Sequence, residues 1–166
     1  MKVYNSATVI SYAPSDQSGQ GLHHDITCCM PSWNGGPAHR DCVFVEGGGI
    51  DGNGFGGLLA TRVCLLFTFG HHGKMYECAL VGWYLPVRNA LDETTGMWIV
   101  APEMDQQGQW VCAMISLDAV LRLAHLIAVY GEDVLLVDFH YTDTLNTFQA
   151  YYVNKYIDYH AHCLAF

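Results

Sequence analysis

The sequence predicts an α+β protein that is mainly β, a rolled sheet or small barrel with an α-helix at its C-terminus. Three observations lead to this prediction. Apolar segments rich in residues that suit a pleated surface recur along the chain, most clearly at Leu58 to Phe69 and Met75 to Tyr84. Turns containing glycine or proline separate these segments. The last segment, Thr142 to Phe166, instead has apolar residues at helical spacing.

The elements expected before residue 58 are short strands between turns. Lys2 to Tyr12 alternates loosely between polar and apolar residues and ends before the turn signal at Pro14. Ile26 to Met30 is expected to form a short strand, and Cys42 to Val45 a buried one. The segment from Gly47 to Gly57, GGGIDGNGFGG, predicts a flexible loop.

The central segments predict a β-hairpin followed by two further strands. Leu58 to Phe69 and Met75 to Tyr84 are joined by the sequence GHHG, a connection of hairpin length with glycine at both ends. An acidic turn, Asp92 to Gly96, leads into an expected strand at Met97 to Val100. Another strand is expected at Trp110 to Ser116.

The C-terminal part predicts two helices with one strand between them. Asp118 to Tyr130 has helical spacing and predicts a short helix, followed by a strand at Val134 to Phe139. In the final segment Thr144 can cap a helix. The apolar stripe of that helix is formed by Leu145, Phe148, Tyr152 and Tyr156.

Length and composition predict one globular domain, residues 1–166. A hydrophobic content of 51% with only 14% charged residues predicts a large core and leaves apolar area that can cover a partner. No apolar run reaches the roughly 18 residues of a membrane span. The first residues lack the apolar segment of a secretory signal. We therefore expect an intracellular protein, nuclear or cytoplasmic, with reduced cysteines.

The net charge of −9 argues against direct binding to nucleic acids or to a membrane surface. Proteins that bind duplexes usually neutralise about 6–10 phosphates with Lys or Arg. This chain holds 7 such residues, and they are scattered along it. A protein is therefore the expected partner.

Two clusters contain residue types that bind zinc. One holds His23 and Cys28 with their neighbours His24 and Cys29, and the other holds His160, His162 and Cys163. Neighbouring residues of a strand point to opposite faces, so each doublet offers only one ligand to a face. Buried reduced cysteine also behaves as a small apolar residue. No cofactor is therefore expected, and a zinc-supported structural domain stays open as an alternative.

Two further sets of residues suggest ligand binding or catalysis. Trp83, Tyr84 and Trp98 lie near strand ends, where aromatic side chains can stack on a ligand, and the acidic turn with Asp92 and Glu93 would favour a cationic one. Asp138 and His140 would share a strand face, so that the carboxylate can orient the imidazole for acid–base chemistry. Neither set has a motif that specifies a reaction.

Seven blocks of sequence, in this order, carry a family resemblance: VYNSATVISYAPSDQSG, PSWNGGPAHRDCVFV, ATRVCLLFTF, YECALVGWY, DETTGMWIV, ISLDAVLRLAHLIAVYG and DTLNTFQAYYVNKYIDYHAH. They resemble the C-terminal region of open reading frames that accompany Kyakuja-Dileera-Zisupton transposons in mushroom-forming fungi. The resemblance implies an intracellular protein of mobile-element origin and assigns no catalytic residue. The order of strand pair, acidic turn, strand and short helix is also similar to bromo-adjacent-homology modules, β-barrel interaction domains of chromatin proteins.

These observations predict a non-enzymatic interaction module that binds protein, with chromatin association and self-association as further expectations. The alternative is a small stand-alone enzyme that uses His140, Asp138 and nearby tyrosines for proton transfer on a small molecule.

Overall fold

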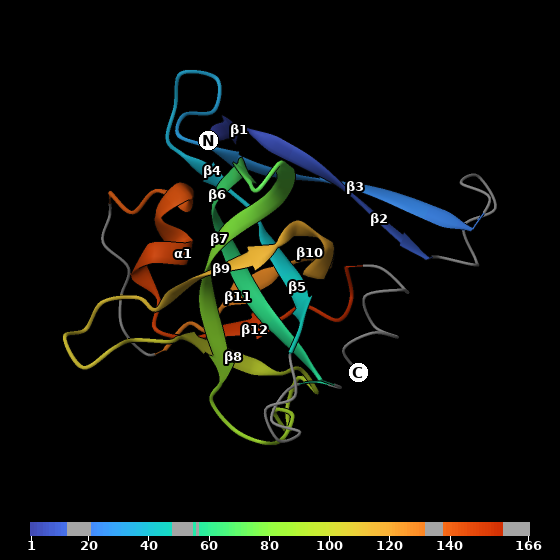
Figure 1. The fold of residues 1–166 in the computed structure, drawn as a ribbon. Coiled ribbons are helices and arrows are strands. Elements are labelled where there is room, and N and C mark those ends of the chain that lie inside the picture. The colour runs from blue at the N-terminus through green and yellow to red at the C-terminus, as the bar shows by residue number, and fades with distance from the viewer. Residues whose placement is uncertain (13–20, 48–54, 56, 132–137, 158–166) are drawn as a thin grey trace.

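The protein forms a nearly closed, barrel-like sheet from which a hairpin projects to one side (Figure 1). The computed structural model describes residues 1–12, 21–47, 55, 57–131 and 138–157. Its strands are β1 (Lys2–Tyr4), β2 (Ser6–Tyr12), β3 (Leu22–Met30), β4 (His39–Arg40), β5 (Cys42–Glu46), β6 (Leu58–His71), β7 (Lys74–Pro86), β8 (Ile99–Pro102), β9 (Cys112–Ser116), β10 (Val120–Ala124), β11 (Leu126–Ala128) and β12 (Tyr151–Val153). Helical structure comprises the 3-10 segments Leu117–Ala119 and Tyr141–Asp143 and the helix α1 (Thr144–Thr147). The predicted mainly β class with a C-terminal helix is confirmed.

The main sheet is curved, and the strands at its two edges are neighbours in the sequence. Its strand order is β10-β5-β6-β7-β8-β12-β11, with β1 also paired to β6 and β9 to β7. The strands at the two ends of this order, β10 and β11, are separated in sequence only by His125. The sheet therefore returns on itself, although β10 and β11 are not paired with each other among the described strands.

The hairpin of β6 and β7 is the longest pairing in the sheet and confirms the sequence prediction. Its two-residue turn consists of His72 and Gly73, whose φ angles are +48° and +75°. Positive φ at both positions defines a type I′ turn, and the twist of that turn matches the twist of the strands that it joins. The strands extend further into the turn than expected, to His71 and Lys74.

A second, three-stranded sheet, β2-β3-β4, forms what we call the arm. Because side chains alternate along a strand, β5 divides its residues between two cores. Phe44 faces the barrel core, which also holds Phe55, Tyr84, Val100 and Tyr151. Val43 and Val45 face the arm core, where they pack with Val9 of β2 and Cys29 of β3. The arm is thus attached through one face of its root.

A buried arginine fixes α1 to the barrel. The Arg62 side chain is 6% exposed. Its Nη1 donates to the carbonyl of Leu145 at 3.3 Å and to Oδ1 of Asn146 at 2.6 Å. Its guanidinium carbon lies 6.0 Å from the ring centre of Trp110. The short helix is therefore held by polar contacts to its backbone and side chains, while Leu145 and Phe148 pack against the barrel core.

Two predicted helices are wrong in extent or in type. Residues 118–130 form a short 3-10 segment and the strands β10 and β11, because Val120 and Arg122 alternate into the interior beside β5. The expected final helix is limited to α1, since Tyr151 and Val153 pair with β8 and β11 and are fully buried. Strand pairing that closes the barrel outweighs the local helical pattern.

Other expectations differ at their boundaries. The strand expected at 26–30 begins at Leu22, the one at 97–100 begins at Ile99, and the one at 110–116 begins at Cys112. Most of the glycine-rich segment 47–57 and of the strand expected at 134–139 lies outside the described residues. Phe55, within the glycine-rich segment, is fully buried. Among the described residues, no helix is both long enough and apolar enough to cross a membrane.

Candidate functional site

The aromatic residues predicted to bind a ligand are divided between the two cores. Tyr84 is fully buried in the barrel core, in edge contact with Trp110. Its neighbour Trp83 points to the opposite face of β7 and packs against the arm core. Trp98 packs against Phe55 in the barrel core, with ring centres 5.9 Å apart. The structure therefore does not bring Trp83 and Tyr84 to a common face.

Asp92 stabilises its own turn. Its carboxylate accepts hydrogen bonds from the Thr95 hydroxyl at 2.8 Å and from the Thr95 N–H at 2.9 Å. These hydrogen bonds lower the pKa of Asp92. Glu93 lies exposed on the same turn. The Asp92 carboxylate is thus engaged by its own turn.

The predicted acid–base pair lies on the surface. Asp138 is exposed in a turn, and His140 is exposed with its Nδ1 2.7 Å from Oγ1 of Thr142. Residues 138–140 contain no strand, so the prediction that both side chains share a strand face is wrong. His125 is exposed between β10 and β11, where its Nδ1 lies 3.0 Å from Nδ2 of Asn154.

The predicted metal ligands of β3 point to opposite faces of the arm. His23 lies on the face toward the barrel, where its Nε2 is 2.9 Å from Oδ1 of Asp25. Cys28 lies on the outer face, as the alternation along β3 requires. The other candidates, His160 and His162, lie outside the described residues.

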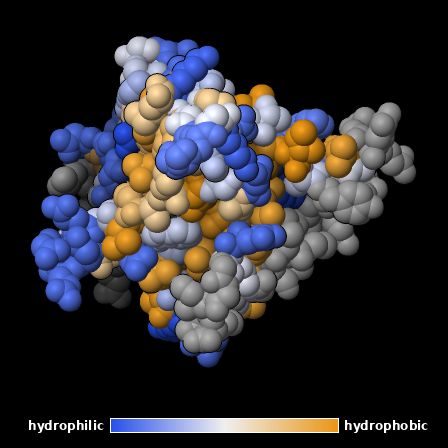
Figure 2. Space-filling model, viewed as in Figure 1, coloured by the Kyte–Doolittle hydropathy of each residue, from blue (hydrophilic) through white to orange (hydrophobic). Residues whose placement is uncertain are grey.

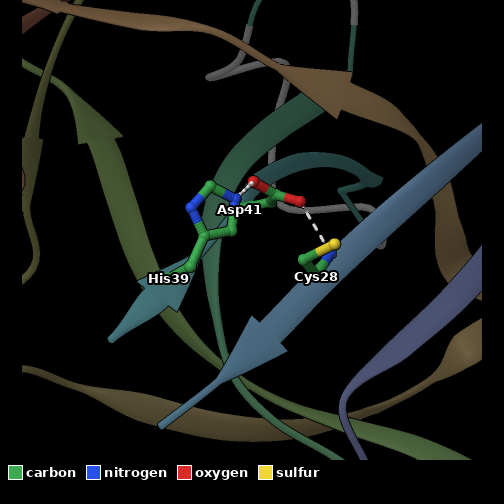
Figure 3. Close-up of side chains that lie close together, drawn as sticks. All are labelled: Cys28, His39 and Asp41. Atoms are coloured by element: carbon green, nitrogen blue, oxygen red, sulfur yellow. Dashed lines mark hydrogen bonds and ion pairs between the residues drawn. The ribbon is translucent and has the colours of Figure 1, made fainter. Parts of the chain in front are cut away.

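Cys28 instead meets two residues that the sequence interpretation missed, His39 and Asp41. One ligand atom from each of the three residues lies within 4.8 Å of the other two. Figure 3 shows the Asp41 carboxylate between the His39 imidazole and the Cys28 thiol. His39 Nε2 is 2.9 Å from Asp41 Oδ1, and the Cys28 N–H donates to Asp41 Oδ2 at 2.6 Å.

The pairing of β3 with β4 explains this arrangement. Met30 pairs with His39 and Cys29 with Arg40, and the ladder continues where the Asp41 N–H donates to the Cys28 carbonyl at 3.0 Å. Residues opposite each other share a face, so Cys28, His39 and Asp41 all lie on the outer face of the arm. Burial and the negative charge of Asp41 raise the pKa of the Cys28 thiol. In the sequence, the signal that could have indicated these two ligands was the H-x-D spacing of His39 and Asp41 directly before Cys42.

The outer face of the arm also exposes apolar side chains. Ile10 is 59% exposed, Ile26 61% and Leu22 43%. The register pairs Ile10 with His24, so Ile10 is the diagonal neighbour of both Ile26 and Leu22. Apolar residues are visible on the projecting part of the molecule (Figure 2). A contiguous apolar group of this kind is typical of an interaction surface.

An open recess lies beside the root of β2. Its volume is about 270 Å³. It is lined by Ser6, Ala7 and Thr8 of β2, by residues of β6, and by Glu77 of β7. The recess thus places a carboxylate next to the strand whose outer edge has no partner in the described part of the chain.

Comparisons with known proteins add no relative. No family model matches the chain, and no curated protein and no solved structure matches it either.

Proposed function

We propose that this protein is a non-enzymatic interaction module that binds an extended segment of a partner protein as an additional strand along β2. The observation that carries the proposal is the open edge of β2, whose seven residues pair only with β3 among the described strands. Ser6–Tyr12 contains no charged residue and no proline. These are the residues that commonly protect an exposed edge, so their absence favours strand addition.

The register indicates which backbone groups would bind the partner. The Cys29 N–H donates to the Asn5 carbonyl at 2.7 Å, and the ladder then runs without a bulge along β2. Antiparallel pairs alternate between hydrogen-bonded and non-hydrogen-bonded. Ser6, Thr8 and Ile10 therefore direct their N–H and carbonyl groups away from β3. Because no other described strand pairs with β2, these groups can bind an extended segment on that side.

Side chains favour an apolar partner segment. The exposed residues Ile10, Leu22 and Ile26 lie on the outer face of the same two strands. A strand added beside β2 would continue this face, and every second side chain of the partner would lie on it, with one of them opposite Ile10. Burial of apolar surface contributes roughly 25 cal/mol per Å². The side chains would thus add to the affinity given by the backbone hydrogen bonds.

Charge favours a basic partner over a second copy. Glu77 lines the recess beside Ser6 and Thr8, and a lysine or arginine of the added segment can reach it. The net charge of −9 attracts a basic segment and repels another copy of the same chain. Self-association, chromatin association, intracellular location and mobile-element origin stay predictions from the sequence. The exposed positions of Asp138 and His140 favour the module over the enzyme hypothesis.

A proline substitution separates backbone recognition from side-chain recognition. The Thr8→Pro variant loses one outward N–H and keeps the ladder to β3, because Thr8 belongs to a non-hydrogen-bonded pair. The Thr8→Ala variant loses the same side chain and keeps the N–H. Displayed libraries of 10-residue peptides that alternate apolar with lysine or arginine residues provide the ligands. Selected peptides are then measured by fluorescence anisotropy.

We expect selected peptides to bind Thr8→Ala within about 2-fold of the unmodified chain and Thr8→Pro about 10-fold more weakly, the effect of one lost hydrogen bond. Equal binding by both variants would overturn the proposal. The proposal would also be overturned if the libraries yielded no binder. A dimer that sedimentation detects in the unmodified chain and that is absent in Thr8→Pro would overturn it too, because a second copy would then occupy the edge of β2. Circular dichroism establishes that both variants are folded.

A further inference from the structure

We propose that Cys28, His39 and Asp41 form a binding site for Zn²⁺ at the root of the arm. The thiolate, imidazole and carboxylate are the three side-chain groups that zinc takes in proteins. Their ligand atoms converge within 4.8 Å on the outer face of the arm, from β3, β4 and the residue that follows β4. This inference does not rest on partner binding at β2.

The separations fit one tetrahedral ion. Zinc bonds of about 2.3 Å to sulfur and about 2.0–2.2 Å to nitrogen or oxygen place tetrahedral ligand atoms about 3.3–3.7 Å apart. Nε2 of His39 and Oδ1 of Asp41 are 2.9 Å apart and need only separate slightly. The Cys28 sulfur already lies within 4.8 Å of the other two ligand atoms, so it has to approach them by no more than about 1.5 Å.

The carboxylate is already oriented for this role. Oδ2 of Asp41 accepts the Cys28 N–H at 2.6 Å, which leaves Oδ1 directed toward His39. Hydrogen bonds of this type commonly orient metal ligands from the second shell. The Asp41 N–H is held in turn by the Cys28 carbonyl at 3.0 Å. Two backbone hydrogen bonds thus fix Cys28 and Asp41 against each other before any ion binds.

The site provides three protein ligands and leaves the fourth position to water or to another molecule. The side chains of His39 and Asp41 are 48% and 23% exposed, so an ion can enter directly from solvent. A bound ion would also tie β3 to β4, which has only two residues. We therefore expect zinc to stabilise the root of the arm together with the connection 31–38.

Cobalt is the probe that reports the ligands directly. The full chain, freed of metal by a chelator, is titrated with Co²⁺ and then with Zn²⁺. We expect one equivalent of Co²⁺ to bind at micromolar concentration, with the near-ultraviolet absorption of a cobalt–thiolate bond. Zn²⁺ should displace it. Cys28→Ser should abolish this absorption, whereas Cys112→Ser, which removes an exposed thiol elsewhere, should retain it.

The other two ligands are tested by affinity. His39→Ala and Asp41→Asn should each weaken Zn²⁺ binding by at least about 100-fold, since loss of an outer-shell partner alone costs about 10–100-fold. Both side chains are partly exposed, so the variants are expected to remain folded. Absence of stoichiometric binding, or unchanged binding in these variants, would overturn the inference. So would loss of binding in a His160→Ala, His162→Ala double variant whose Cys28 group is intact.

Discussion

Replacement of Phe55 by alanine tests whether the glycine-rich segment contributes a core residue. Phe55 is fully buried, and its ring centre lies 5.7 Å from that of Phe44 and 5.9 Å from that of Trp98. Truncation of a buried phenylalanine to alanine costs about 3–5 kcal/mol, because it removes apolar contacts and leaves a cavity. The neighbouring aromatic rings in the barrel core leave few small side chains that could fill it.

The expected shift in melting temperature follows from the size of the chain. The entropy of unfolding is about 2.1 cal/mol/K per residue, or about 350 cal/mol/K for 166 residues. A loss of about 3–5 kcal/mol then lowers the melting temperature by roughly 9–14 °C. Calorimetry and urea unfolding measure both quantities. Ile26→Ala, at a position 61% exposed, is the matched control and should change stability by less than about 0.5 kcal/mol.

A destabilisation below about 1 kcal/mol for Phe55→Ala would refute this reasoning. It would mean that the barrel closes without this side chain, and that the segment around Phe55 is only a connection between β5 and β6.

Three further predictions concern the barrel interior. Asn146→Ala removes an acceptor from the buried Arg62 guanidinium and should cost about 1–3 kcal/mol in urea unfolding. Burial raises the pKa of the Cys42 thiol to about 12, so the unfolded chain releases this proton first. The free energy of unfolding should therefore fall as pH rises from about 9 to 12, and this thiol contributes a slope of up to about 1.4 kcal/mol per pH unit. In the Cys42→Ala variant the free energy of unfolding should fall less steeply over the same range. A Cβ at Gly82 would lie 2.6–2.9 Å from ring atoms of Trp110, so Gly82→Ala should cost about 1–3 kcal/mol and alter tryptophan fluorescence.

Each of these predictions has a control and an outcome that contradicts it. Asn89→Ala changes an exposed loop residue and should be neutral, and an equal effect at both asparagines would remove the role assigned to Arg62. The same alkaline slope with and without Cys42 would show that other groups cause it. Gly131→Ala adds a Cβ in open space and should be tolerated. Equal tolerance of Gly82→Ala would mean that Trp110 is not tightly packed.

The sequence predicted those parts of the fold that depend on local signals. The β6–β7 hairpin was predictable because two apolar strands flank a short turn that contains Gly73, and both signals lie within a few residues. The final helix was not, because the helical spacing of Leu145, Phe148 and Tyr152 continues into a segment that forms a strand, in which Tyr151 and Val153 are the buried residues. Only pairing with β8 and β11, distant in sequence, decides between them.

The candidate sites were less predictable than the fold. Cys28 was named from its residue type only as a candidate ligand, in a sequence for which no metal site was favoured. His39 and Asp41 become its neighbours only through the pairing of β3 with β4. The open edge of β2 depends on which strands pair, and the sequence did not reveal this. The burial of Phe55 was not predicted, because the glycines around it predict a loop and one aromatic residue does not change that prediction.

Hydrogen exchange at individual amides of β2 tests the central claim most directly. In the free protein, Ala7 and Val9 bond to β3 and should exchange slowly, whereas Thr8 and Ile10 should exchange fast. A selected peptide should protect Thr8 and Ile10 strongly and change Ala7 and Val9 little. Protection that appears elsewhere on the molecule, with fast exchange retained at Thr8 and Ile10, would contradict the account.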